Sequence, residues 1–352
     1  MNSKNMSKVG VIGSGSFGTA IANLLAVKNE VLLYVRNPET MAQMKETRTS
    51  RGQAMHENIV LTDDPAYLCD ECILIYPMVA SKGFRAMCQQ FNPLFRPDHI
   101  IIHGTKGLNI TPPDGWDEGD EIRLDKKYIH TMTEVIKQET NVLRVGCLSG
   151  PNLSGELAEL KPAATVIASR FDEVIEAGKR TIRSDRFRVY SSNDVLGVEL
   201  SGVLKNIMAI ASGILDGLEL GINTRSLLIT RALGEMVKIG KVLGSSADAF
   251  LGMAGIGDLI ATCSSPKSRN FTVGRRLASG ESLQMILEDM NEVVEGVRTA
   301  KTAYAVAKQY DIHTPIIESV YNILYKDMDI QEAMHYLMTH GYDRDADFLE
   351  ML

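Results

Sequence analysis

The sequence predicts an α/β fold in which a doubly wound parallel sheet is followed by an all-α domain. A chain of 352 residues is long enough for two domains, each with its own core. The first 150 or so residues alternate short β-rich runs with helical patterns, whereas the chain from about Asp194 onward is almost entirely helical in pattern. We therefore expect a first domain over residues 1–192 and a second over residues 193–352.

The strands of the first domain are predicted from short apolar runs that end in turn residues. The expected strands are Val9–Ile12, Glu30–Val35, Cys72–Tyr76, His99–His103 and Arg144–Leu148, with Thr165–Ile167 and Arg188–Tyr190 extending the sheet. Several of these runs end in loops of small or charged residues, namely Gly13–Gly18, Pro77–Ser81, Gly104–Gly107 and Ser149–Ser154. Because ligands bind outside the carboxyl ends of the strands in such sheets, we expect these loops to converge on one crevice.

The second domain is predicted from long helical segments joined by glycine-containing turns. The expected helices are Asn193–Glu219, Thr224–Leu243, Ser282–Met290, Gly296–Gln309 and Thr314–Lys326. No flexible linker separates the domains, so we expect them to pack closely with a cleft between them. Thr111–Lys127 is acidic and carries the only tryptophan; we expect an exposed excursion such as a hairpin, with a regulatory or partner contact as the alternative.

Composition excludes several classes of protein. The formal charge of −7, from 37 basic and 44 acidic residues, argues against a general nucleic-acid binder. The apolar runs fall short of the ~20 residues that span a bilayer, so no membrane insertion is expected. Five scattered cysteines do not form a disulfide framework, which favours reduced thiols and a cytoplasmic location.

A glycine-rich loop predicts dinucleotide binding. Gly13-Ser14-Gly15-Ser16-Phe17-Gly18 directly follows a predicted strand and precedes a helix, which is the Rossmann-like arrangement that holds a pyrophosphate at a helix N-terminus. Arg36 directly follows the second predicted strand, at the position where an acid would select NAD. Arg36 can pair with a 2′-phosphate, which favours NADP, or stack on adenine without selecting either cofactor.

Two lysines are candidates for catalysis. Lys106 follows a fully apolar strand, between Gly104 and Gly107, which brings it to the carboxyl edge of the sheet. Lys205 lies in a helix that is apolar almost all round, and a lysine is almost never buried unpaired. We therefore expect Lys205 to be the general acid/base; the alternative is a lysine that snorkels to the surface.

Two further motifs lie in the helical half of the sequence. In residues 252–263 a turn leads into a short helix that places Asp258 and Thr262 on one face, where Asp258 can bond an adjacent lysine. Ser268, Arg269 and Asn270 together can hold a phosphate, or can simply begin a helix. The spacing of Cys69 and Cys72 has no second cysteine pair or histidine partner, so no metal is predicted.

Taken together, these motifs resemble the NAD(P)-dependent glycerol-3-phosphate dehydrogenase family, in particular its bacterial biosynthetic form. The resemblance runs from about Lys8 to Glu332. It rests on GSGSFGTA at 13–20, GTKGL at 104–108, LSGPN at 148–152, ELSGVLKNIMAIASG at 199–213, GMAGIGDLIATC at 252–263, SRN at 268–270 and VVEGVRTA at 293–300. It implies interconversion of sn-glycerol 3-phosphate and dihydroxyacetone phosphate with NAD or NADP, which supplies glycerophospholipid biosynthesis.

The resemblance also implies roles for single residues. Lys205 is the proton donor to the ketone oxygen, and Lys106, Asp258 and Thr262 complete the catalytic set. Substrate contacts are implied for Lys106, Gly150, Asn152, Lys205, Asp258, Ser268, Arg269 and Asn270. Cofactor contacts are implied for Gly13, Ser14, Gly15, Ser16, Phe17, Gly18, Arg36, Pro77, Lys106, Ser154, Arg269, Val293 and Glu295. Asn152 stands where relatives often have serine or threonine, and residues 111–127 form a longer connection than is usual.

Two alternatives remain open from the residues. One is a related Rossmann-plus-helical dehydrogenase of 3-hydroxy acids or sugar acids, which would not need the cluster around Arg269. The other is a non-catalytic dinucleotide-sensing protein, which would not need both Lys106 and Lys205. The apolar helices of the second half lead us to expect a homodimer.

Overall fold

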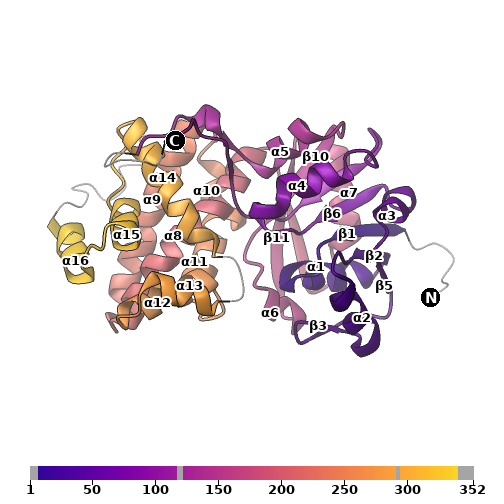
Figure 1. Cartoon of the computed structure of the whole chain (residues 1–352), viewed down its shortest axis with the longest axis horizontal. Coiled ribbons are helices and arrows are strands. Elements are labelled where there is room, and N and C mark those ends of the chain that lie inside the picture. The colour runs from indigo at the N-terminus through magenta and orange to yellow at the C-terminus, as the bar shows by residue number, and fades with distance from the viewer. Residues whose placement is uncertain (1–6, 117–121, 291–293, 340–352) are drawn as a thin grey trace. The chain divides into compact units, whose positions relative to one another are not determined.

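The computed structural model describes residues 7–116, 122–290 and 294–339 (Figure 1). Contacts divide the chain into two compact units, residues 1–109 with 131–195 and residues 110–130 with 196–352. The chain therefore crosses between the two units three times, after residues 109, 130 and 195. The boundary between residues 192 and 193 as the limit of two independent domains stays a prediction.

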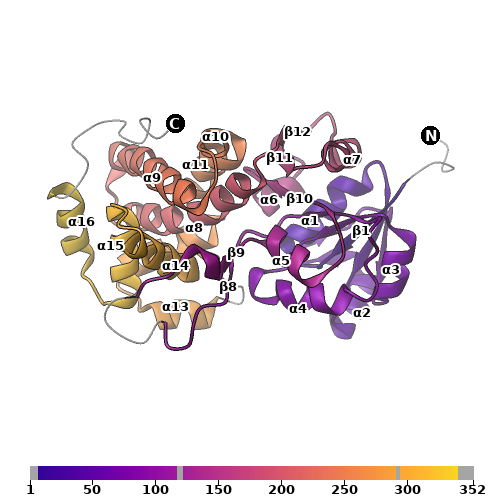
Figure 2. The ribbon, with the colours of Figure 1, turned by 90° about the horizontal axis from the view of Figure 1, so that it is seen from above.

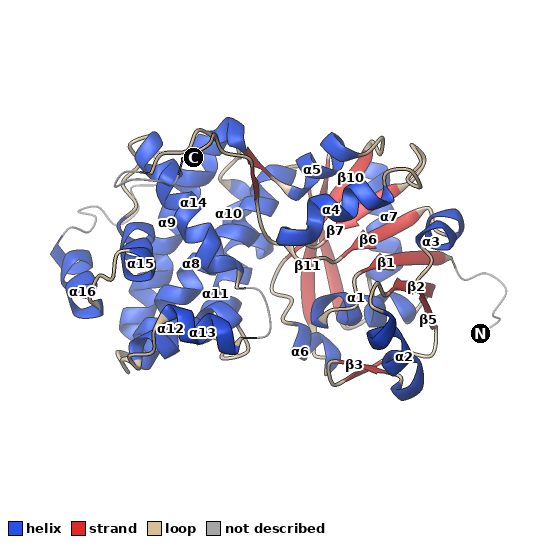
Figure 3. Ribbon diagram, in the orientation of Figure 1, coloured by secondary structure: helices blue, strands red, loops and turns tan. Residues whose placement is uncertain are grey.

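The first unit is built on a mixed sheet, drawn in red in Figure 3. In the described part of the chain this sheet has eight strands in the order β12-β11-β10-β7-β6-β1-β2-β5. Its strands are β1 Lys8–Ile12, β2 Glu30–Tyr34, β5 Ile59–Thr62, β6 Leu74–Pro77, β7 Ile100–His103, β10 Arg144–Ser149, β11 Ala163–Ser169 and β12 Phe187–Ser192. Two short ladders join β3 Thr49–Ser50 to β4 Gln53–Ala54 and β8 Asn109–Ile110 to β9 Ile129–His130.

The predicted strands are all present in the eight-stranded sheet, to which the structure adds one strand, and one pairing in it is antiparallel. β5 was not predicted, because its run is short and half exposed at the edge of the sheet. β11 pairs antiparallel with β10, whereas the sheet was expected to be parallel throughout. The connection from β10 to β11 contains the short helix α6 Ser154–Ala158 and returns the chain antiparallel to β10.

Helices cover both faces of this sheet, because its strands are apolar on both sides. Val31 and Leu33 belong to one buried cluster, whereas Leu32 and Tyr34 belong to the other, as the alternation of a strand requires. The helices of this unit are α1 Ser16–Ala26, α2 Pro38–Thr47, α3 Pro65–Glu71, α4 Ser81–Phe91, α5 Met132–Glu139, α6 Ser154–Ala158 and α7 Asp172–Ile182. Side chains of α1 and α7 join the first cluster and those of α4 and α5 the second.

The second unit is helical, as predicted. Its helices are α8 Val195–Gly217, α9 Gly221–Leu243, α10 Asp248–Leu251, α11 Asp258–Cys263, α12 Arg269–Ala278, α13 Leu283–Asp289, α14 Glu295–Gln309, α15 Pro315–Tyr325 and α16 Ile330–Thr339, with a π-helical turn at Met253–Gly257. By length and hydropathy α8 could cross a membrane, although counting uninterrupted apolar runs had not indicated this. Its most apolar stretch is completely buried among the other helices, so α8 serves here as a core helix.

Glycines let α8 and α12 approach until their backbones touch. A Cβ atom on Gly213 of α8 would lie 2.0 Å from the carbonyl oxygen of Phe271, and one on Gly274 of α12 would lie 2.0 Å from that of Ile210. No larger residue fits at either position. This crossing sets how closely the beginning of α12 approaches the middle of α8.

The segment 110–130 belongs to the helical unit (Figure 2). Most of its described residues are exposed or half-buried and β8 pairs with β9 at its base, as expected of a hairpin-like excursion, but some of its apolar side chains are buried. Ile122 and Leu124 are buried, and the Leu124 N–H donates to the carbonyl oxygen of Ala305 on α14. The Arg123 guanidinium donates to the carbonyl oxygen of Lys308. The acidic and proline-rich composition of the segment gave no indication that Ile122 and Leu124 are buried.

Candidate active site

The glycine loop has the geometry that dinucleotide binding requires. Gly13 has φ of +113°, and a Cβ atom there would lie 2.7 Å from the carbonyl oxygen of Met78. A Cβ on Gly18 would lie 2.0 Å from the carbonyl oxygen of Gly13, so the third glycine is needed for close packing. A Cβ on Gly15 would meet nothing within 4 Å, which leaves open space before the N-terminus of α1.

The four predicted loops of the first unit lie next to one another. The Met78 N–H donates to the carbonyl oxygen of Ile12, and the Gly104 N–H donates to that of Pro77. The Thr105 hydroxyl donates to the carbonyl oxygen of Val79 at 2.6 Å. The loops thus form one continuous edge at the carboxyl ends of β1, β6, β7 and β10, as the sequence predicted.

Lys106 extends along this edge to the fourth loop. Its Nζ donates to the carbonyl oxygen of Gly150 at 3.1 Å, and Gly150 has φ of +152°. The Asn152 amide donates to the Thr165 hydroxyl at 2.9 Å, while the buried Oδ1 of Asn152 has no partner among the described residues. A buried acceptor without a partner is costly, which is consistent with a ligand donor at this position.

The remaining predicted residues of the first unit lie at the same edge. Arg36 is exposed just after β2, Pro77 ends β6, and Ser154 begins α6. The Gly13 N–H donates to the carbonyl oxygen of Tyr34, which brings the end of β2 next to the glycine loop. Arg36 therefore extends from the strand beside the loop, where the sequence predicted the ribose end of a dinucleotide.

The second unit holds a buried charged cluster. The Lys205 Nζ donates to Asp258 Oδ1 at 2.5 Å and to the Thr262 hydroxyl at 2.6 Å. All three residues are at most 5% exposed. The Thr262 hydroxyl in turn donates to the carbonyl oxygen of Asp258, one helical turn earlier. The ammonium is therefore neutralised and held in place by the two residues that the sequence placed on one face.

Local structure explains how α11 comes to face α8. The chain enters α11 through the π-helical turn at Met253–Gly257, a conformation often found at functional sites. Two hydroxyls of α8 then fasten this stretch: Ser201 donates to the carbonyl oxygen of Ala254, and Ser212 to that of Cys263. These bonds lie on either side of Lys205 along α8.

The predicted phosphate residues form the start of α12. Ser268 is the N-cap and its hydroxyl accepts from the Phe271 N–H, so these residues do begin a helix, and their role in phosphate binding stays a prediction. Arg269 is exposed, whereas Asn270 is 8% exposed. Glu295 is the first residue of α14, and the predicted cofactor contact Val293 lies outside the described residues.

Two residues of this region were not predicted from the sequence. Asn206 follows Lys205 on α8, and its Oδ1 accepts from the Asn270 amide at 3.0 Å. Gly296 follows Glu295, and its N–H donates to Asn270 Oδ1 at 2.9 Å. The sequence offered a signal for Asn206 alone, a polar residue directly beside Lys205 in a largely apolar helix, and this signal does not indicate its partner.

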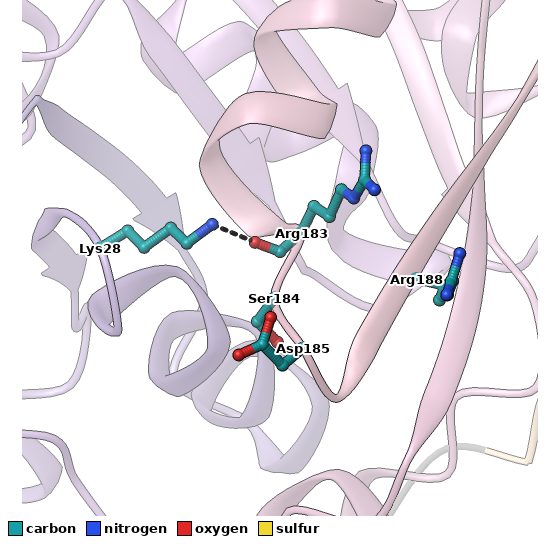
Figure 4. A pocket seen from close by; sticks show the side chains of 5 residues that line it. All are labelled: Lys28, Arg183, Ser184, Asp185 and Arg188. Atoms are coloured by element: carbon teal, nitrogen blue, oxygen red, sulfur yellow. Dashed lines mark hydrogen bonds between the residues drawn. The ribbon is translucent and has the colours of Figure 1, made fainter.

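A surface pocket on the first unit contains none of the predicted site residues. It has a volume of about 250 Å³ and is lined by Lys28, Arg183, Ser184, Asp185 and Arg188 (Figure 4). The Lys28 ammonium donates to the carbonyl oxygen of Arg183 at 2.6 Å. Lys28 follows the last turn of α1, at the opposite end of that helix from the glycine loop.

The glycine loop of the first unit and the buried lysine cluster of the second define a dinucleotide-dependent oxidoreductase. The family described as NAD-dependent glycerol-3-phosphate dehydrogenase matches at residues 8–175 with its N-terminal part and at residues 194–335 with its C-terminal part. The chain belongs to the NAD-dependent glycerol-3-phosphate dehydrogenase family.

Individual relatives agree with this membership. The glycerol-3-phosphate dehydrogenase [NAD(P)+] of Geobacter metallireducens is 39% identical over 343 residues, which cover 94% of this chain and 97% of the relative. That of Ectopseudomonas mendocina is 36% identical and covers 98% of both chains. The crystal structure of glycerol-3-phosphate dehydrogenase from Coxiella burnetii superposes with a TM-score of 0.84 at 30% identity, covering 95% of this chain and 99% of that one.

Proposed function

We propose that the protein interconverts dihydroxyacetone phosphate and sn-glycerol 3-phosphate, with NADH or NADPH as the reductant in the forward direction. The observation that carries this proposal is the buried Lys205 ammonium, held between Asp258 and Thr262. A dinucleotide sensor has no need of such a cluster. Family membership supports the substrate.

The residues of the first unit fit a dinucleotide. Gly13, Ser14, Gly15, Ser16, Phe17 and Gly18 would hold the pyrophosphate at the N-terminus of α1, where an open space lies before Gly15. Arg36 would contact the adenosine, and the other proposed cofactor contacts are Pro77, Lys106, Ser154, Arg269, Val293 and Glu295. The nicotinamide ring supplies the hydride when the dinucleotide is bound.

Lys205 acts as the general acid in this proposal. As the ketone is reduced, its oxygen gains negative charge, and Lys205 gives that oxygen a proton. Asp258 and Thr262 hold the ammonium in one orientation, so little reorganisation is needed when the charge develops. In the reverse direction Lys205 takes the proton from the alcohol.

The substrate phosphate is proposed to bind at the beginning of α12. The helix N-terminus favours negative charge there, and the Arg269 guanidinium can pair with two phosphate oxygens. Ser268 and Asn270 belong to the same turn. Lys106, Gly150 and Asn152 are proposed to contact the substrate from the first unit.

The cellular setting is proposed from the same features. Reduced, buried cysteines favour the cytoplasm, and complete burial of the apolar stretch of α8 argues against membrane insertion. We expect a homodimer that supplies glycerol 3-phosphate for glycerophospholipid biosynthesis.

The test is the oxidation of NADH and of NADPH in parallel assays with dihydroxyacetone phosphate. Turnover with this substrate, and much less with unphosphorylated dihydroxyacetone, is expected. A preference for NADPH that is lost in Arg36→Ala would assign the 2′-phosphate contact to Arg36. Tight dinucleotide binding without turnover would instead favour a carboxylate substrate or a sensor.

A further inference from the structure

Three helices of the second unit meet at one buried carboxamide, that of Asn270 on α12. Its amide nitrogen donates to Asn206 Oδ1 on α8 at 3.0 Å, and its oxygen accepts from the Gly296 N–H on α14 at 2.9 Å. Asn206 and Asn270 are 6% and 8% exposed. We call these three residues the amide relay.

The orientation of the two carboxamides follows from the backbone groups that they contact at either end of the relay. The Gly296 N–H can only donate, so the atom of Asn270 that faces it must be the oxygen, and the nitrogen must face Asn206. Asn206 must therefore present its own oxygen, and its nitrogen then faces the carbonyl oxygen of Gly202 at 3.4 Å. Each donor meets an acceptor, so neither carboxamide can turn over without breaking the chain of bonds.

The relay also satisfies a backbone group that would otherwise lack a partner. Gly296 lies in the first turn of α14, where N–H groups have no intrahelical acceptor, and the N-cap residue Val294 offers no side-chain oxygen. A Cβ atom on Gly296 would lie 2.5 Å from Asn270 Oδ1 and 2.7 Å from the Asn206 carbonyl oxygen. Glycine is therefore required at the meeting point.

We infer that Asn206 is a positioning residue for recognition of the substrate phosphate, which it performs through Asn270. This inference rests on the proposed function. With its oxygen held by Gly296, Asn270 can present only its second amide hydrogen to a ligand, and this hydrogen has no acceptor among the described residues. A fixed donor beside Arg269 suits a phosphate, whereas a turned amide would present an oxygen that repels it.

The amide relay also connects three sequence motifs that are far apart along the chain. Asn206 directly follows Lys205, Asn270 directly follows Arg269, and Gly296 directly follows Glu295. The amide relay thus fixes the proton donor, the phosphate residues and the first turn of α14 relative to one another. Loss of one bond should disturb phosphate recognition before it disturbs proton transfer.

The test compares Asn206→Leu with Asn29→Leu. Asn29 is also a buried carboxamide that donates two hydrogen bonds to backbone oxygens, but it lies in the first unit, at the end of α1 away from the glycine loop. Asn206→Leu should weaken calorimetric binding of sn-glycerol 3-phosphate by about tenfold or more and raise KM for dihydroxyacetone phosphate equally. Its kcat/KM for unphosphorylated dihydroxyacetone and its NADH affinity should stay within about threefold of wild type.

Asn29→Leu should lower the melting temperature but leave the affinity for sn-glycerol 3-phosphate and the KM for dihydroxyacetone phosphate unchanged. If Asn206→Leu also lowers only the melting temperature, the relay is structural and the inference is wrong. Should Asn206→Leu not fold, Gly296→Ala tests the same bonds, and Gly83→Ala is its control because a Cβ there would lie 3.7 Å from its nearest neighbour.

Arg269→Ala separates this inference from the proposed function. If Arg269→Ala loses phosphate affinity and Asn206→Leu does not, only the relay fails. If both variants bind sn-glycerol 3-phosphate as the wild type does, the proposed phosphate site itself is wrong.

Discussion

The Lys205 ammonium and the Asp258 carboxylate are both almost completely buried, so each charge depends on the other. Removing one partner of such a pair leaves an uncompensated charge in the interior, which costs about 3–5 kcal/mol. A core helix would be more simply stabilised by an apolar residue at position 205. The retained ion pair at this position is consistent with a chemical role.

Lys205→Ala is expected to lower turnover by about 100-fold or more, the scale of losing a general acid. Dinucleotide affinity should stay near that of the wild type, because the glycine loop is unchanged. Steady-state kinetics and NADH titration at a temperature where the variant is folded measure the two effects. Lys45→Ala, on the exposed face of α2, is the control, and a turnover of Lys205→Ala within a few-fold of wild type would contradict the assignment.

At this scale the sequence predicted correctly that Lys205 is buried and paired, because a lysine in an apolar helix requires a partner. It also indicated Asp258 and Thr262, since a spacing of four places two side chains on one helix face. Asn206 and Gly296 could not be recognised in the same way. Their importance depends on the crossing of three helices, and nothing in their local sequence records that crossing.

Among the elements, α15 shows how a distant side chain can begin a helix. Its first residue, Pro315, has no N–H, and the next two N–H groups donate to the carboxylate of Glu235 at 2.7 and 3.0 Å. Glu235 lies on α9 and is completely buried. The carboxylate thus supplies the cap that the N-cap residue Thr314 does not.

Glu235→Ala is expected to reduce the free energy of unfolding by about 2–4 kcal/mol, since two charge-assisted hydrogen bonds are lost and two buried N–H groups remain unpaired. Urea denaturation measures the change. Glu46→Ala, an exposed acid on α2, should change stability by less than about 0.5 kcal/mol. Equal stability of the two variants would show that α15 does not depend on Glu235.

The connection before β7 contains a titratable contact. His99 is buried; its Nδ1 accepts from the Arg96 N–H and its Nε2 lies 2.9 Å from the Cys69 carbonyl oxygen. Burial lowers the pKa of His99 below its ordinary value of 6.5, so the native state favours the neutral ring. The unfolded chain therefore takes up a proton first as the pH falls.

Stability contributed by His99 should be fully present above pH 6.5 and decrease as the pH falls from there towards the lower native pKa. The melting temperature of the wild type should decrease more between about pH 7.5 and about pH 5.5 than that of His99→Asn. Parallel pH profiles for the two proteins would show that another group dominates acid destabilisation.

The order of helices and strands along the chain could be predicted from the sequence, but the antiparallel direction of β11 and the edge strand β5 could not. Apolar runs and turn residues predicted the strands around the glycine loop, because burial on both faces of a sheet imposes a strong pattern. The reversed β11 depends on how its connection folds, and β5 is an edge strand with only half its side chains buried. The burial of Ile122 and Leu124 could not be predicted, because two apolar residues in a polar stretch show no helical or strand periodicity.

For the whole molecule, all five cysteines are free and buried. Burial raises the pKa of Cys69, Cys72, Cys88 and Cys263 to about 12, so these thiols remain protonated at neutral pH. A protonated, inaccessible thiol is a poor nucleophile.

The native protein should therefore react only slowly with a thiol-specific colorimetric reagent. After denaturation all five thiols should react at once. Fast labelling of one thiol in the native protein would show that the burial described for that cysteine does not hold in solution.

Because residues 110–130 belong to the helical unit, they restrict how the helical domain of this enzyme can be exchanged with that of a relative. A chimera made by exchanging everything after residue 195 would bring a foreign helical domain to a host that still carries Ile122 and Leu124. Those two side chains would then meet a surface that did not evolve with them, as would the backbone bond from Leu124 to α14. A helical domain should therefore be exchangeable between relatives only if residues 110–130 and residues 196–352 are exchanged together. The coding sequence of this domain is thus interrupted in the gene by that of the other unit.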